Sequence, residues 1–173
     1  NVNILCFNEN QLIGNGMIFP SGPLRDEITS LKDVHLVLIN GNKNIAFENK
    51  ILKINREIKI FYSKYQPLNL EKFKNKNLLA LAGIANPQNF FSLLKDNNLK
   101  VEKELVFPDH YEFKKSEIDN IIDIANKHSL EIIMTEKDYF KVKKFNIHSI
   151  NYLKVNLVIQ EKEKFINRIL ESC

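Results

Sequence analysis

The chain has 173 residues, which is enough for one domain or for one lobe of a larger enzyme. Its 44% hydrophobic and 27% charged residues are typical of a soluble globular protein, and no apolar run approaches the roughly 20 residues of a membrane-spanning helix. Twenty-five basic residues against 21 acidic ones give a net charge of +4. Because no helix-turn-helix, RNP-like or zinc-ribbon pattern accompanies this small excess, we expect no nucleic-acid partner.

The two cysteines indicate neither a disulfide framework nor a zinc site. Cys6 lies in an apolar run and is expected to be a small buried side chain, whereas Cys173 is the last residue. Because there is no CxxC and no dense cysteine pattern, a reducing, cytosolic setting is the simplest interpretation, and no basic-then-apolar leader marks the chain for export. The chain starts inside an apolar run rather than with Met, which indicates that residues upstream of Asn1 are missing from this sequence.

The first 77 residues are predicted to form buried strands, a loop, a short helix and a more exposed region. In the exposed region Ile58, Ile60 and Tyr62 alternate onto one face, which is typical of a strand. In chain order we expect a strand at 2–7, a loop at 14–23, a helix at 24–32, a strand at 34–39, one or two exposed strands at 45–65 and a surface linker at 66–77.

In the remaining residues, strands alternate with helices. Pro87 favours the first turn of a helix with Asn86 as its cap, and Ser116 is expected to open a clear amphipathic helix. We expect strands at 78–82, 101–107, 132–135 and 155–159, and further helices at 136–142 and 165–170. This alternation predicts an α/β fold with a partly parallel, mixed sheet and flanking helices.

The loop at 14–26 (GNGMIFPSGPLRD) is the most informative segment. It contains three glycines, which allow sharp turns, and two prolines, which fix the backbone. A rigid loop that ends by presenting the Arg25 guanidinium suits a phosphate group, which arginine binds through two parallel hydrogen bonds. The alternative is an ordinary connection from a strand to a solvated helix.

This loop and four later segments resemble, in the same order, the tetraacyldisaccharide 4'-kinases, the lipid A 4'-kinases of Gram-negative bacteria. The later segments are 37–41 (VLING), 82–87 (AGIANP), 107–110 (FPDH) and 135–138 (TEKD). The resemblance runs from the first residues to at least Asp138. It implies the C-terminal part of a P-loop-type kinase.

The resemblance implies roles for four residues. His110 aligns with a histidine that assists a catalytic aspartate in drawing the proton from the sugar hydroxyl. Arg25, Asp26 and Asn15 would bind the lipid substrate, with Asp26 in place of a more usual glutamate. From the residues alone, a loop histidine bonded to its own backbone and an asparagine that caps a turn remain the alternatives. The TEKD segment needs no ligand, because Thr135 can cap a helix whose first turn carries two acids.

No P-loop is present, because none of the five glycines begins the run Gly-x-x-x-x-Gly-Lys-Ser/Thr. The resemblance therefore implies that ATP and Mg²⁺ bind to a half of the enzyme that this chain lacks, and we expect no cofactor or metal site here. Within the chain we assign residues 1–41 to the end of the core sheet and the substrate loop, 42–77 to exposed strands and a linker, and 78–173 to a C-terminal α/β lobe.

The function implied by the resemblance is transfer of the ATP γ-phosphate to the 4'-hydroxyl of a tetraacyldisaccharide 1-phosphate, in lipid A biosynthesis. The partners implied are this glycolipid and, through peripheral association, the cytoplasmic face of the inner membrane. Because the P-loop is missing, we expect the isolated chain to be inactive. The alternative is a noncatalytic glycolipid-binding or remnant α/β module without ATP binding.

Overall fold

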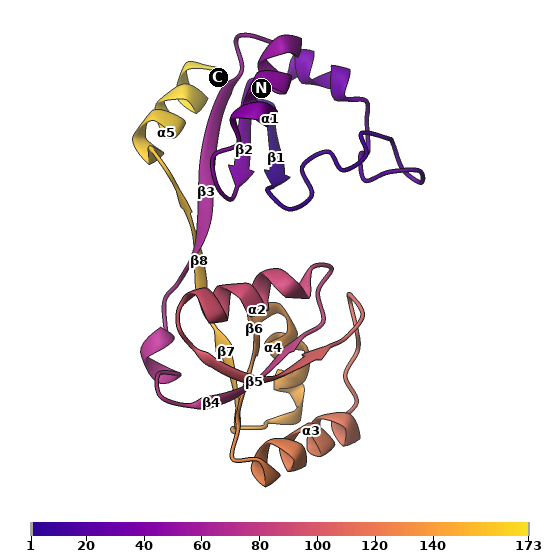
Figure 1. Cartoon of the computed structure of the whole chain (residues 1–173), viewed down its shortest axis with the longest axis vertical. Helices are drawn as coiled ribbons and strands as arrows, with labels where there is room; N and C mark the ends of the chain where they lie inside the picture. Colours follow the sequence, from indigo (N-terminus) through magenta and orange to yellow (C-terminus); the bar gives the residue numbers. More distant parts are fainter. Residues whose placement is uncertain (1, 173) are drawn as a thin grey trace. The chain divides into compact units, whose positions relative to one another are not determined.

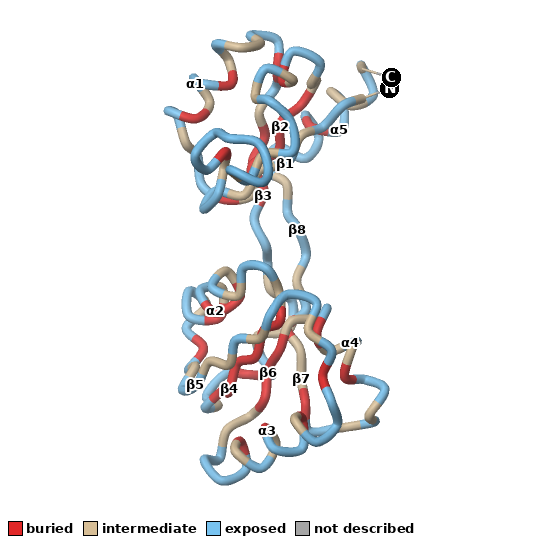
Figure 2. Tube along the Cα trace, turned by 90° about the vertical axis from the view of Figure 1, so that its right-hand side faces the viewer, coloured by how far each residue is buried: buried red, intermediate tan, exposed pale blue. Residues whose placement is uncertain are grey.

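The computed structural model describes residues 2–172, so Cys173 lies outside the described residues. The chain divides into two compact units, one formed by residues 1–66 with 156–173 and the other by residues 67–155. Each unit contains one four-stranded sheet and its own hydrophobic core (Figure 1). Buried residues concentrate on the inner strands of each sheet (Figure 2). We describe the units separately, as the first and the second unit.

The sheet of the first unit has the strand order β1-β2-β3-β8, in which β1, β2 and β3 pair in parallel. The apolar run of β2 is buried on both faces, as expected for an inner parallel strand. The elements of this unit are β1 (Ile4–Asn8), the 3-10 helix η1 (Ile28–Asp33), β2 (Leu36–Asn40), α1 (Ile45–Ile54), β3 (Lys59–Pro67), β8 (Val155–Ile159) and α5 (Lys162–Glu171).

Helices cover both faces of this sheet. Phe47 and Ile51 of α1 pack with Leu31 of η1 in one apolar cluster. On the opposite face Phe165 of α5 meets Phe61 edge to face, with ring centroids 5.2 Å apart. The central strands are thereby shielded from water on both sides.

Three predictions for this unit are wrong. Residues 45–54 form a helix rather than a strand, because Phe47, Ile51 and Ile54 recur at helical spacing and the Asn44 side chain accepts a hydrogen bond from the Phe47 amide. The helix expected at 24–32 begins only at Ile28, because the Leu24 amide donates to the loop carbonyl of Met17.

Cys6 is exposed rather than buried. It lies on β1, the edge strand of the sheet. The cluster beneath α5 is built from Leu36, Leu38, Phe61 and Phe165, so it covers the inner strands and does not extend to the Cys6 thiol.

The sheet of the second unit is parallel throughout, in the order β5-β4-β6-β7. Its elements are the 3-10 helix η2 (Leu70–Lys72), β4 (Asn77–Ala82), α2 (Pro87–Asp96), β5 (Lys100–Val106), α3 (Lys115–Lys127), β6 (Glu131–Thr135), α4 (Glu136–Val142), the 3-10 helix η3 (Lys143–Phe145) and β7 (Ile150–Leu153). The predicted fold class, an α/β fold with parallel strands and flanking helices, is confirmed, although the strands form two sheets.

Strand β4 is the centre of the second core, and its side chains alternate between two clusters. Leu78, Ala80 and Ala82 face the cluster that contains Phe90, Phe91 and Leu94 of α2. Leu79 and Leu81 face the cluster that contains residues of α3 and α4. Because both faces of β4 are buried in this way, its carboxyl end and Gly83, which directly follows it, are held at a fixed position among the neighbouring elements.

The helix starts in this unit follow local chemistry. Pro87 occupies the first turn of α2, as predicted. Helix α3 begins at Lys115, one residue before the predicted Ser116, and the Glu117 carboxylate accepts a hydrogen bond from the Lys114 amide at 2.9 Å. Between residues 2 and 172, no helix combines the length and the apolar character needed to cross a membrane.

Candidate functional site

The glycine- and proline-rich loop of the first unit is closed by the side chain of Asn15. Its Nδ2 donates to the Ser21 carbonyl at 2.8 Å, and its Oδ1 accepts from the Met17 amide at 3.0 Å. A Cβ at Gly22 would collide with this amide oxygen and with the Met17 carbonyl. Asn15 therefore fixes the shape of the loop, as the turn-capping alternative expects, and its binding to a sugar stays a prediction.

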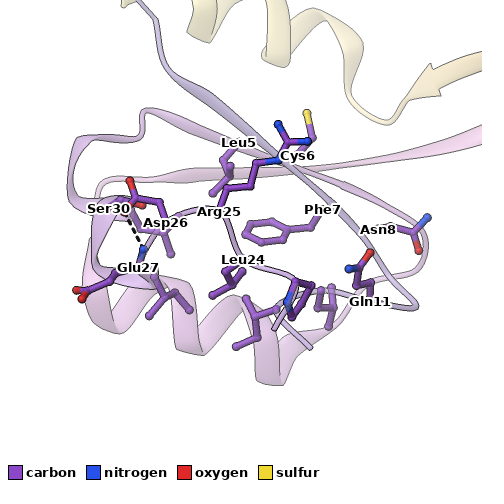
Figure 3. Close-up of a pocket in the computed structure, with 15 residues that line it drawn as sticks. Leu5, Cys6, Phe7, Asn8, Gln11, Leu24, Arg25, Asp26, Glu27 and Ser30 are labelled. Atoms are coloured by element: carbon purple, nitrogen blue, oxygen red, sulfur yellow. Dashed lines mark hydrogen bonds between the residues drawn. The ribbon is translucent and has the colours of Figure 1, made fainter. Parts of the chain in front are cut away.

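The loop, β1 and η1 surround a pocket of about 300 Å³ (Figure 3). Arg25 and Asp26 both line it, together with Cys6, Phe7 and Leu24. The Asp26 carboxylate accepts a hydrogen bond from the Glu27 amide at 2.8 Å and does not pair with Arg25. Within the described range 2–172, no side chain forms a hydrogen bond or ion pair with the Arg25 guanidinium. This pocket therefore offers a free planar cation beside apolar walls, which suits a phosphate on an apolar carrier.

His110 lies on a tight turn in the second unit. The turn is closed by a hydrogen bond from the Tyr111 amide to the Pro108 carbonyl, and His110 itself adopts a left-handed backbone with φ of +60°. Its side chain is 80% exposed, with Nε2 at 3.8 Å from Oδ2 of Asp109. The turn therefore presents the imidazole to solvent, where it can exchange a proton with a bound ligand.

Asp109 is the partner that gives this turn its charge. Its Oδ1 accepts hydrogen bonds from Lys137 Nζ at 3.0 Å and from the His110 amide at 2.9 Å. The hydrogen bond from Lys137 is the main cause that lowers the pKa of Asp109, and the His110 amide adds to it. A carboxylate is thus held ionised 3.8 Å from the imidazole of His110.

Tyr111 anchors the other side of the turn. Its hydroxyl donates to Glu117 at 2.6 Å, which raises the pKa of Tyr111. Its ring packs at about 5 Å from those of Phe107 and Phe113. Tyr111 therefore works as a structural anchor of the turn.

Asp138 is the residue whose importance sequence reasoning missed. We interpreted it as an acid near a helix dipole, and the Thr135 cap is indeed present, with its hydroxyl accepting from the Asp138 amide at 3.2 Å. The Asp138 carboxylate, however, is completely buried. It accepts hydrogen bonds from the Gly83 amide at 2.8 Å, the Thr135 hydroxyl at 2.7 Å and Lys141 at 3.0 Å.

The segments 82–87 and 135–138 therefore contact each other, because the Gly83 amide donates a hydrogen bond to the Asp138 carboxylate. A Cβ at Gly83 would lie only 3.2 Å from Oδ1 of Asp138 and 3.4 Å from the Pro108 carbonyl, so the close approach favours glycine. The sequence offered one indication of this contact. Each segment follows a predicted strand, and the carboxyl ends of parallel strands meet at the same edge of a sheet. Arg25 belongs to the first unit and His110 to the second, so the pocket and the turn are described as two separate groups of residues.

Comparison with known proteins identifies a family and supports the fold. The profile of the family LpxK, described as tetraacyldisaccharide-1-P 4'-kinase, matches residues 1–173. The fold is also similar to a crystal structure of LpxK from Aquifex aeolicus in complex with ATP, with a TM-score of 0.59, 17% identity, and coverage of 98% of this chain and 52% of that one. At this identity the likeness shows the fold alone.

Curated relatives carry the same family name. A tetraacyldisaccharide 4'-kinase of Pelagibacter ubique is 42% identical over 171 residues, covering 97% of this chain and 54% of that protein. A relative from Rickettsia akari is 31% identical, covering 98% of this chain and 51% of that protein. The chain belongs to the tetraacyldisaccharide-1-P 4'-kinase family, and it spans about half the length of these relatives.

Replacing Asp138 by Ala is expected to destabilise the chain by about 3–5 kcal/mol, because it leaves Lys141, only 15% exposed, and the Gly83 amide without their buried partner. The free energy of unfolding in urea measures this loss. The exposed Asp119 on α3 is the matched control, and its replacement by Ala is expected to cost less than about 0.5 kcal/mol. Equal effects at the two positions would contradict the buried network.

Replacing Lys137 by Gln is expected to raise the pKa of Asp109, because the main cause of its lowering is removed. In the unchanged chain the ion pair stabilises the turn above the pKa of Asp109, and this contribution is lost as the pH falls through it. NMR titration of the Asp109 carboxyl carbon measures both pKa values. The control is Lys144→Gln, since Lys144 pairs with Glu112 instead. An Asp109 pKa that is the same in both variants would show that Lys137 has no influence.

Proposed function

We propose that this chain supplies the substrate loop and the proton-transfer histidine of a tetraacyldisaccharide 4'-kinase. The complete enzyme transfers the γ-phosphate of ATP to the 4'-hydroxyl of a tetraacyldisaccharide 1-phosphate. The observation that carries the proposal is the family match over residues 1–173, since it includes the turn that presents His110 beside Asp109.

In this proposal His110 assists removal of the proton from the 4'-hydroxyl as that oxygen attacks the γ-phosphorus. The ionised Asp109 carboxylate lies 3.8 Å from the imidazole, where it can stabilise the positive charge that the ring gains when it takes up the proton. Arg25 binds a phosphate of the glycolipid, because its guanidinium is free and lines a pocket with apolar walls. Catalysis by a kinase of this kind depends on positioning and on stabilising charge.

We propose that ATP and Mg²⁺ bind outside this chain, and two observations on residues 2–172 support this. The loop at 14–23 is closed on itself by Asn15 and is followed by a 3-10 helix, so it offers no cradle of amides at the start of an α-helix. No three side chains of His, Cys, Asp or Glu converge on a metal position among residues 2–172. We therefore assign nucleotide and Mg²⁺ to the part of the relatives that this chain does not match.

We propose peripheral association with the cytoplasmic face of the inner membrane, because the substrate in this reaction is a glycolipid. The second candidate function is a noncatalytic glycolipid-binding module. The observation that favours it is the lack of a phosphate-cradling loop in these residues. An activity measurement on a protein that contains both halves separates the two functions.

The test joins this chain to the part of the Pelagibacter kinase that it does not match, and measures phosphate transfer from labelled ATP to the disaccharide. We expect activity, and replacing His110 by Asn is expected to lower kcat about 100-fold with little change in the KM for ATP. Asn tolerates the left-handed backbone of this position, so the melting temperature should persist.

The control for this prediction is His148→Asn, since His148 is also exposed and belongs to no motif. A folded chimera without transfer activity would favour the binding module. An active chimera whose kcat survives His110→Asn would return His110 to a structural residue of the turn.

Replacing Arg25 by Ala is expected to raise the KM for the glycolipid about 10- to 100-fold while leaving that for ATP nearly unchanged, because one charge-assisted contact with the lipid is lost. Steady-state kinetics of the same chimera measure both constants. Arg56→Ala is the matched control, since Arg56 is an exposed arginine of the same unit outside the pocket. An unchanged glycolipid KM would make Arg25 a solvated residue of the loop.

A further inference from the structure

The loop that precedes Arg25 exposes three consecutive large apolar side chains at its tip. Met17 is 55% exposed, Ile18 41% and Phe19 77%. Across residues 2–172 this is the longest consecutive run of exposed large hydrophobic residues. Single exposed apolar residues are ordinary, whereas a contiguous group usually marks a contact surface. Figure 1 shows the loop, in indigo, extending away from the sheet of its own unit.

The tip has a defined shape. The Phe19 amide donates to the Leu24 carbonyl at 2.7 Å, and the Leu24 amide donates back to Met17 at 3.2 Å. The Ile18 carbonyl accepts from the amides of Ser21 and Gly22 at 3.0 and 3.1 Å. The Asn15 clamp described above closes the base. The apolar side chains are thus carried on a folded support.

The same hydrogen bonds decide which partner the tip suits. Backbone groups that enter hydrocarbon need internal partners, because lipid offers none. At the tip the Met17 amide and carbonyl, the Ile18 carbonyl and the Phe19 amide are all paired inside the loop, and Pro20 has no amide hydrogen. These internal pairs lower the cost in hydrogen bonds of moving the tip out of water, while its side chains gain from burial.

We propose that Met17, Ile18 and Phe19 insert into the interfacial region of a phospholipid bilayer. Arg25 directly follows the hydrogen-bonded base of the loop at Leu24, so its unpaired guanidinium is brought to the level of the phosphate headgroups. The insertion is argued from the loop alone, whereas its purpose, delivery of a bilayer-borne glycolipid to the Arg25 pocket, rests on the proposed function. Three side chains give a shallow and reversible anchor.

The chain contains no tryptophan, so a single substitution provides a depth probe. Phe19→Trp in the 173-residue chain is mixed with vesicles of phosphatidylethanolamine and phosphatidylglycerol that lack any glycolipid. We expect a blue shift of the Trp emission and strong quenching by phospholipids brominated on their acyl chains. Phe140→Trp is the matched control, because Phe140 is 58% exposed on α4 of the second unit. Absent quenching at Trp in place of Phe19, or equal quenching at both positions, would overturn the proposal.

A second pair of variants tests affinity without a probe. Phe19→Asp is expected to lower the vesicle-bound fraction about tenfold at limiting lipid, because an apolar ring is replaced by a charge. Leu170→Asp, at a residue 67% exposed on α5 of the same unit, is expected to leave it unchanged. Both side chains are exposed, so both melting temperatures should persist. Equal losses would overturn the assignment to the loop.

The outcomes separate this inference from the proposed function. Binding that requires added glycolipid would mean that the tip holds the acyl chains of the substrate, and would overturn bilayer insertion. No binding to any vesicle, with a chimera active on substrate in detergent, would overturn the membrane role and leave the kinase function in place. Insertion together with an inactive chimera would support bilayer insertion of the tip and overturn the proposed kinase function.

Discussion

A carboxylate that is removed from water must find hydrogen-bond donors, and Asp138 finds three of them at the edge of the second sheet. Its contact with the Gly83 amide joins the start of α4 to the end of β4. The Phe107 amide in turn donates to the Ala82 carbonyl, so the end of β5 is attached to the same point. The turn that carries His110 begins directly after this junction, and its position therefore depends on the buried carboxylate.

The second unit contains a buried ion pair and an exposed ion pair, and the two have different roles. Asp138 and Lys141 form a buried pair whose function is structural. Asp109 and Lys137 form an exposed pair next to the imidazole, where solvent screening makes the energy small and orientation matters more. The segment 135–138 contributes a residue to each ion pair, since Lys137 contacts Asp109 in the turn while Asp138 is buried in the core. One short segment thus couples the stability of the sheet edge to the electrostatics of the candidate site.

In the loop of the first unit, neutral groups rather than charged ones hold the backbone in place. Asn15 and the glycines give it a fixed shape, and that shape leaves the apolar side chains of the tip and the Arg25 guanidinium beyond its base exposed. A loop that served only as a connection would not need three apolar side chains facing solvent. Its construction is therefore better explained by contact with an amphiphilic ligand or surface, in which apolar and anionic groups occur together.

The sequence by itself determined the α/β class, most of the strands and the segments that carry the candidate site, because buried strands and turn residues leave local patterns. It did not distinguish α1 from a strand, since the helical spacing of Phe47, Ile51 and Ile54 runs directly into the alternation of β3. Local pattern also could not show that Cys6 is exposed, because burial depends on which neighbouring elements cover a strand.

Only the tertiary structure decided that Asp138 is buried, that Asp109 pairs with Lys137, and that Arg25 has no partner within the described residues. These contacts join residues that are far apart in sequence, as Gly83 is from Asp138. A carboxylate has the same local pattern whether it faces water or an amide from another strand. Its environment, and with it the difference between a structural and a functional charge, is set by the packing of the sheet.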